Sequence, residues 1–114
     1  MEASSQSAGE YPVVYKVARV GDTGTGVCTQ HDTPQVVTVT FTTGSPNHFC
    51  DGLAVVRVGD YGIASCGHQA QAVTGSSILF LDGLAAHIEG STGIIIGGGN
   101  YTCNTTTADM DTVS

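Results

Sequence analysis

Apolar and polar positions recur along this chain in a repeated order. Residues 43–54 read Thr-Gly-Ser, five further residues and then Asp-Gly-Leu-Ala, and residues 74–85 repeat that order 31 positions later. A shortened copy covers residues 90–98, and the Val-Arg-Val-Gly-Asp of residues 56–60 echoes the Ala-Arg-Val-Gly-Asp of residues 18–22. Self-similarity of this kind predicts a fold built from repeated supersecondary units.

Each full copy predicts a β-hairpin. In the first copy, residues 47–50 form one strand, residues 51–52 a two-residue turn and residues 53–58 the returning strand, because Asp-Gly between apolar residues favours a type I′ turn. Residues 82–83 predict the same turn in the second copy. Pairing across the first turn sets three pairs of residues opposite one another: Cys50–Leu53, Phe49–Ala54 and His48–Val55. Both faces of each hairpin are largely apolar, so the alternation leaves open which face is the core.

The remaining segments complete an all-β prediction. Residues 34–42 alternate Val or Phe with Thr or Gln and indicate a strand, and residues 94–96 favour a core strand over a docking surface. Residues 1–10 and 104–114 are small and polar, and we expect flexible tails there, with a C-terminal strand only where that stretch meets a partner. The sequence therefore predicts one domain over residues 11–103.

Composition narrows the class of partner. The chain has 114 residues, 16 of them glycine, and a net charge of −7, which argues against nucleic acid and against an anionic membrane because either would need basic clusters. Residues 1–10 do not resemble a signal peptide, and no apolar run has the roughly 20 residues of a membrane helix. We therefore expect a protein made in the cytoplasm, without stable membrane association.

Cysteine and histidine residues cluster in two corresponding loops. Cys28 and His31 follow the first Gly-Asp pair, and Cys66 and His68 follow the second. Equivalent loops of a repeat converge at one end of a fold, and Cys and His are the ligands that tetrahedral Zn²⁺ prefers. A buried Cys acting as a small apolar residue and a hydrogen-bonded His remain the alternatives. Disulfides are disfavoured in a cytoplasmic product.

The phrase over residues 44–60, Gly-Ser-Pro-Asn-x-Phe-x-Asp-Gly-Leu-Ala-Val-Val-Arg-Val-Gly-Asp, closely resembles that of the PAAR-repeat proteins. The resemblance covers about residues 15–100. It implies an all-β, cone- or pyramid-shaped domain of pseudo-repeated β-hairpins. It also implies a base that docks on the trimeric β-helical spike of a contractile injection machine, and an apex that holds a metal ion.

The resemblance also implies a ligand set. Carried over position by position, it assigns three histidines and one cysteine to a closed, structural metal site: His31, Cys66, His68 and His87. Zinc is the expected ion and iron the second candidate. Cys28 rivals Cys66, and His48 or Cys50 could add to the set or replace a member. The prolines of the family phrase are Ala54 and Ala85 here.

The expected function is mechanical rather than catalytic. The resemblance implies a monomer that caps and sharpens a trimeric spike of a phage tail or a type VI secretion-like machine for piercing a cell envelope. It would be made in the bacterial cytoplasm and assembled into the tail tip or spike, with an effector or a tail-tube component as a further partner. The alternative is a small zinc hydrolase with an open, His-ligated site, for which Glu89 is the nearest candidate base.

Overall fold

The structure is a computed structural model that describes residues 13–104, 106 and 109–112. Among these residues there are twelve β-strands and no helix, so the expected all-β class is confirmed. Accordingly, no helix able to cross a membrane is found in the described part of the chain. Residues 1–10, for which a tail was expected, lie outside it. The strands are β1 (Val13–Lys16), β2 (Thr23–Cys28), β3 (Gln35–Phe41), β4 (Phe49–Cys50), β5 (Leu53–Ala54), β6 (Tyr61–Ala64), β7 (Gln69–Ala72), β8 (Phe80–Leu81), β9 (Leu84–Ala85), β10 (Thr92–Ile95), β11 (Gly99–Cys103) and β12 (Asp109–Thr112).

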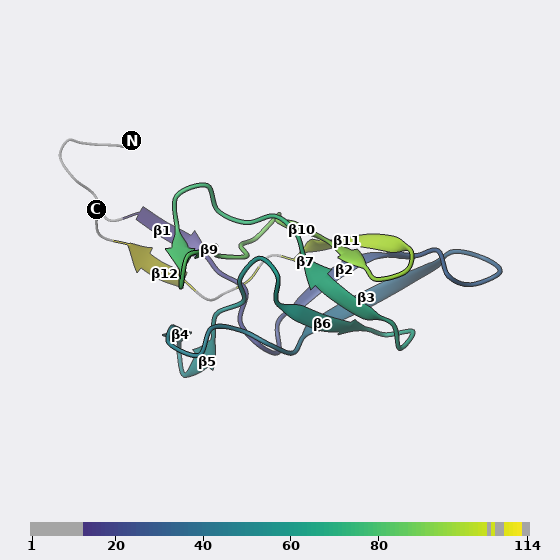
Figure 1. Cartoon of the computed structure of the whole chain (residues 1–114), viewed down its shortest axis with the longest axis horizontal. Helices are drawn as coiled ribbons and strands as arrows, with labels where there is room; N and C mark the ends of the chain where they lie inside the picture. The colour runs from purple at the N-terminus through teal and green to yellow at the C-terminus, as the bar shows by residue number, and fades with distance from the viewer. Residues whose placement is uncertain (1–12, 105, 107–108, 113–114) are drawn as a thin grey trace.

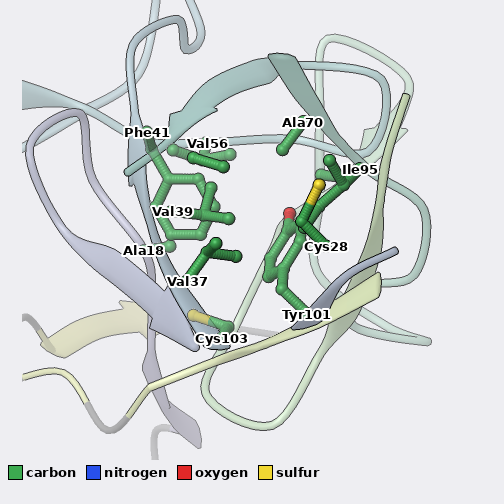
Figure 2. Close-up of a cluster of buried hydrophobic side chains, with 12 residues drawn as sticks. Ala18, Cys28, Val37, Val39, Phe41, Val56, Ala70, Ile95, Tyr101 and Cys103 are labelled. Carbon is green, nitrogen blue, oxygen red and sulfur yellow. The ribbon is translucent and has the colours of Figure 1, made fainter. Parts of the chain in front are cut away.

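Six strands close into an antiparallel barrel in the order β10-β11-β2-β3-β6-β7. Strand β3 lies within the predicted range, and alternate side chains of it point inward. The alternation on β10 likewise exposes Ile94 and buries Ile95, and Ile96, just after the strand, is exposed. Figure 2 shows ten of the side chains that fill the interior: Ala18, Cys28, Val37, Val39, Phe41, Val56, Ala70, Ile95, Tyr101 and Cys103. Because most of these side chains are small, the barrel is narrow.

Glycines let the largest of these side chains fit. The ring of Tyr101 is almost fully buried and lies against Gly93 of the adjacent strand β10. A Cβ atom on Gly93 would stand 2.2 Å from Cε2 of that ring, far inside van der Waals contact. Gly93 is therefore required by the close approach of the ring.

Three segments of the chain are joined by a closed ring of backbone hydrogen bonds between Ala18, Val56 and His87. The Ala18 N–H donates to the His87 carbonyl (2.9 Å), that of His87 to Val56 (2.8 Å), and that of Val56 back to Ala18 (2.9 Å). All three residues are fully buried, and the ring satisfies polar groups that water cannot reach. Three isolated bridges surround the ring in the same cyclic order: Arg19 with Val55, Arg57 with Ala86 and Ile88 with Val17.

Two short hairpins project from this ring. Strand β4 pairs with β5 and β8 with β9, and Cys50–Leu53 and Phe49–Ala54 are opposite one another as predicted. Asp51 and Asp82 have φ of 53° and 56°, as the first position of a type I′ turn demands. The returning strand was predicted to run over residues 53–58, but it ends at Ala54. The predicted pair His48–Val55 keeps one hydrogen bond, from the Val55 N–H to the His48 carbonyl (3.1 Å). The strand ends because Val55 also bridges to Arg19, and the residues after it pair within the ring.

One face of each hairpin is buried against the rest of the molecule. Cys50 and Leu81 are buried in a second, smaller apolar cluster next to the ring. Phe49 and Phe80, each one residue earlier and therefore on the opposite face, are exposed. The two sides of each hairpin therefore differ in burial although both are apolar.

An ionic network joins Asp82, in the turn between β8 and β9, to residues of the first sequence repeat. Arg57 donates to Asp60 through Nε (3.0 Å) and Nη2 (3.3 Å), and through Nη1 to Asp82 (3.1 Å). Asp82 also accepts from the Ser45 hydroxyl (2.5 Å) and the Asn47 amide (2.9 Å). These hydrogen bonds, that of Ser45 above all, lower the pKa of Asp82. Its counterpart Asp51 accepts only a long 3.4 Å bond, from Arg19.

The two ends of the chain form a third antiparallel pair. Strand β1 pairs with β12, from Val13 opposite Thr112 to Lys16 opposite Asp109. Residues 109–112 thus form a strand inside the stretch for which a C-terminal tail was expected. The strand forms because β1 offers a partner. In Figure 1 this pair and the two hairpins lie on one side of the molecule, and the β2–β3, β6–β7 and β10–β11 connections project on the opposite side.

We expect Asp82→Ala to lower the thermal midpoint clearly more than Asp51→Ala. Both variants place Ala at the same strained turn position, so that cost cancels. Only Asp82→Ala removes the acceptor shared by Ser45, Asn47 and Arg57. Thermal unfolding followed by circular dichroism at neutral pH checks this, and equal midpoints for the two variants would contradict it.

Candidate metal centre

Two adjacent connections of the barrel bring four potential metal ligands together. Cys28 is the last residue of β2 and His31 lies in the β2–β3 connection, while Cys66 and His68 lie between β6 and β7. Since β3 pairs with β6, both connections emerge at the same end of the barrel. One ligand atom of each residue lies within 4.8 Å of the other three.

His68 stands between the two thiols. Its Nδ1 atom is 3.3 Å from the Cys28 sulfur and 3.3 Å from the Cys66 sulfur. The ring of His31 lies beside that of His68, with 5.2 Å between their centroids. Nδ1 of His68 is therefore the nitrogen that faces the group.

The spacing fits a tetrahedral ion. Ligand distances of about 2.0–2.3 Å correspond to tetrahedral edges of about 3.3–3.8 Å. The two sulfur–Nδ1 distances match the short end of that range, and no pair of ligand atoms is more than about 1 Å wider. Two thiols and two imidazoles are a donor set that zinc readily takes.

One buried atom lacks a partner unless an ion is bound. Nε2 of His31 is shielded from solvent and has no hydrogen-bond partner among the described residues. A buried polar nitrogen in that state costs about 1–3 kcal/mol. An ion held by this nitrogen would remove that cost.

The group is anchored in the core. Cys28 is fully buried among the apolar side chains of the barrel, and Cys66 packs against the same cluster. His31 and His68 are half-buried. An ion at this place would close the loop end of the barrel, where the apolar core stops.

The β10–β11 connection supplies none of the four residues, but it is hydrogen-bonded to Gln30 of the β2–β3 connection. The Gln30 amide donates to the Ile96 and Gly98 carbonyls (3.0 Å each) and approaches the Cys28 sulfur at 3.7 Å. Gly97 has φ of 99°, and a Cβ there would lie 2.5 Å from Gln30 Oε1. Gln30 thus ties the ligand-free loop to the ligand-bearing one.

The structure brings together three of the four predicted ligands, His31, Cys66 and His68, and leaves His87 apart. His87 is fully buried, and its backbone N–H and carbonyl take part in the ring of hydrogen bonds. Its Nδ1 lies 2.7 Å from the Thr74 carbonyl and its Nε2 3.1 Å from the Tyr101 hydroxyl. Because a carbonyl only accepts, Nδ1 carries the proton and Nε2 accepts from Tyr101. Both nitrogens are therefore engaged, and Cys28 stands in the group in its place.

The other candidates also lie elsewhere. His48 is on the first hairpin, with Nε2 3.6 Å from Asp82. Cys50 belongs to the smaller apolar cluster and Cys103 to the barrel core. The sequence did contain a signal for Cys28, because a Cys shortly before a His occurs in both corresponding loops, three positions before His31 and two before His68. The sequence makes Cys28 a rival of Cys66, whereas the structure brings both together.

Comparison of the chain with protein-family models and with curated proteins gave no match.

We expect the purified protein to hold a metal ion that His31→Ala and His68→Ala each largely release. Removing one of four ligands opens the shell, and the lost binding energy appears as lost stability. Elemental analysis and thermal unfolding with and without a chelator measure both effects.

The control is His48→Ala, which leaves the four-residue group untouched. It should keep the full metal content and the chelator-sensitive midpoint. Full metal content in both ligand variants would contradict the site.

We expect His87 to make the fold less stable as the pH falls below about 6.5. Burial lowers the pKa of His87 below the 6.5 of the free side chain, against smaller opposing effects of Thr74 and Asp60. The unfolded chain then binds a proton that the folded chain does not, so stability is complete above 6.5 and is lost on acidification. Phe41 and Tyr101 also contact the ring and carry no compensating charge.

His87→Leu tests this assignment. At pH 7.5 we expect it to cost about 1–3 kcal/mol, because Tyr101 and Thr74 lose a partner. Between pH 7.5 and 5 the variant should lose less stability than the wild type. Parallel pH profiles of urea unfolding would rule out His87 as the titrating group.

Proposed function

We propose that this chain is a PAAR-like tip protein that caps the trimeric spike of a contractile injection machine. The observation that carries the proposal is the group of Cys28, His31, Cys66 and His68 at the loop end of the barrel, formed by corresponding loops of two repeats. In this proposal the loop end is the apex of a cone and the opposite side is its base.

The proposed role of the ion, taken to be zinc, is structural. Four protein ligands would complete its tetrahedral shell, which is typical of structural rather than catalytic zinc. It would cross-link two loops where the barrel has little apolar core left. Glu89, the base that a hydrolase would need, is not among the residues gathered there.

The cyclic backbone ring supports the choice of partner. Ala18, Val56 and His87 repeat the same hydrogen bond around one centre, so a single chain presents three similar segments. Such an arrangement allows a monomer to match a three-fold symmetric surface. The pseudo-repeated hairpins would face that surface.

The proposed base is apolar. Phe49 and Phe80 occupy equivalent positions on the two hairpins and are each 55% exposed. Leu53 and Leu84, which follow the turns of the same hairpins, are exposed as well. Exposed apolar groups gathered on one side of a small protein mark an interaction surface. The occupant to which we commit is the apolar end of a trimeric β-helical spike.

Co-expression with the trimeric β-helical spike protein from the same genome tests the proposal. We expect a stable complex of one chain with three spike subunits, measured by light scattering after size exclusion. Phe49→Asp and Phe80→Asp should each weaken binding at least about ten-fold, because a charge would be buried in an apolar interface.

Ile94→Asp is the matched control, since Ile94 is exposed on the outer face of the barrel. It should leave binding unchanged. Failure of the wild-type chain to bind the spike, or undiminished binding by both hairpin variants, would overturn the proposal.

A further inference from the structure

Two thiols of the candidate metal centre lie close to each other on different loops. The sulfur atoms of Cys28 and Cys66 are within 4.8 Å of one another, and none of the four cysteines is in a disulfide. Both sulfurs contact the same nitrogen of His68. A disulfide needs a sulfur–sulfur distance of about 2.05 Å, so the two sulfurs, and the loop that carries Cys66, must move closer together for the bond to form.

We infer that Cys28 and Cys66 form a redox-sensitive pair that exchanges the bound metal for a disulfide. The inference rests on the proposed metal-stabilised tip and concerns the regulation of that site. With hydrogen peroxide as oxidant, the thiolate of Cys66 attacks one peroxide oxygen, which gives the sulfenic acid and releases hydroxide. The thiolate of Cys28 then attacks that sulfur, the disulfide forms and a second hydroxide leaves. The two sulfurs give up two electrons and the peroxide accepts them.

The burial of the two thiols sets this order. Cys66 is half-buried and offers the entry for a small oxidant, whereas Cys28 has no exposed surface. Cys28 is therefore protected from direct oxidation and serves as the resolving thiol. A nearby resolving thiol intercepts the sulfenic acid before further oxidation.

The other two thiols do not compete. Cys103 is buried in the barrel core, and burial raises its pKa to about 12, so it stays protonated and unreactive. Cys50 lies under the hairpins, in a cluster separate from the barrel core that holds Cys28. The positions of the four cysteines therefore favour a disulfide between Cys28 and Cys66.

The exchange would keep the same two loops cross-linked. A metal would link Cys28 at the end of β2 and His31 in the β2–β3 connection to the β6–β7 connection. A disulfide would link Cys28 to Cys66 of that same β6–β7 connection. Reducing compartments keep thiols free for metal, and oxidising ones favour disulfides. A protein that leaves the cytoplasm would then retain a cross-linked tip on either side of the membrane.

The test treats the zinc-loaded full-length chain with hydrogen peroxide. We expect loss of the bound zinc, followed with a chromogenic chelator, and parallel loss of two of the four free thiols. Cleavage at Phe and Tyr residues separates all four cysteines, so mass spectrometry should find the peptides of Cys28 and Cys66 joined. Reduction in the presence of zinc should restore the starting state.

Two variants complete the design. Cys50→Ser should leave zinc release and the disulfide unchanged, and Cys66→Ser should give no linked peptide. Sulfinic acid without a disulfide, a disulfide through Cys50 or Cys103, or zinc retained after oxidation would overturn the inference. Because spike binding and metal content are measured separately, a chain that binds both but forms no disulfide refutes this inference alone.

Discussion

Three backbone hydrogen bonds, which join Ala18, Val56 and His87 in a closed ring, hold the parts of this molecule in their places. Ala18 lies between β1 and β2, Val56 between β5 and β6, and His87 between β9 and β10. The ring therefore holds together the segments that lead into three of the six barrel strands, β2, β6 and β10. The bonds are shielded from water by the two apolar clusters on either side. Breaking one would leave a donor and an acceptor without a partner, at a cost of about 1–3 kcal/mol for each group.

The candidate metal centre depends on this ring indirectly. Strands that start from a common ring and run with similar lengths must end together, which gathers their connections at one place. The interior between is filled by Val, Ala and Cys side chains, with Phe41, Ile95 and Tyr101 as the largest members. Such a core gives the loops little apolar support, so cross-links between loops carry a large share of their order. Gln30 supplies such a link to the β10–β11 connection without a ligand of its own.

The turns and the pairing of neighbouring strands could be predicted from the sequence, and the pairing of segments far apart in the chain could not. The Asp-Gly turns and the facing pair of Cys50 and Leu53 follow from turn geometry, which involves only neighbours. The early end of β5 at Ala54 depends on Arg19, far away in the chain, and no local pattern reveals that partner. The same holds for the candidate ligands. The grouping of His31, Cys66 and His68 could be expected from corresponding loops. The position of His87 apart from that group could not, because only the folded core shows Thr74 and Tyr101 at its two nitrogens.

The pairing of β1 with β12 has a consequence for how the chain is made. Val13 can pair with Thr112 only after Thr112 has been synthesised, and β2 likewise has to wait for β11. The β-hairpins can form as they emerge from the ribosome, but the barrel cannot close until Cys103 has appeared. Pairings between distant segments are slow because chain entropy is lost before contacts repay it. Closure of the barrel, which needs β11, should therefore follow formation of the local hairpins.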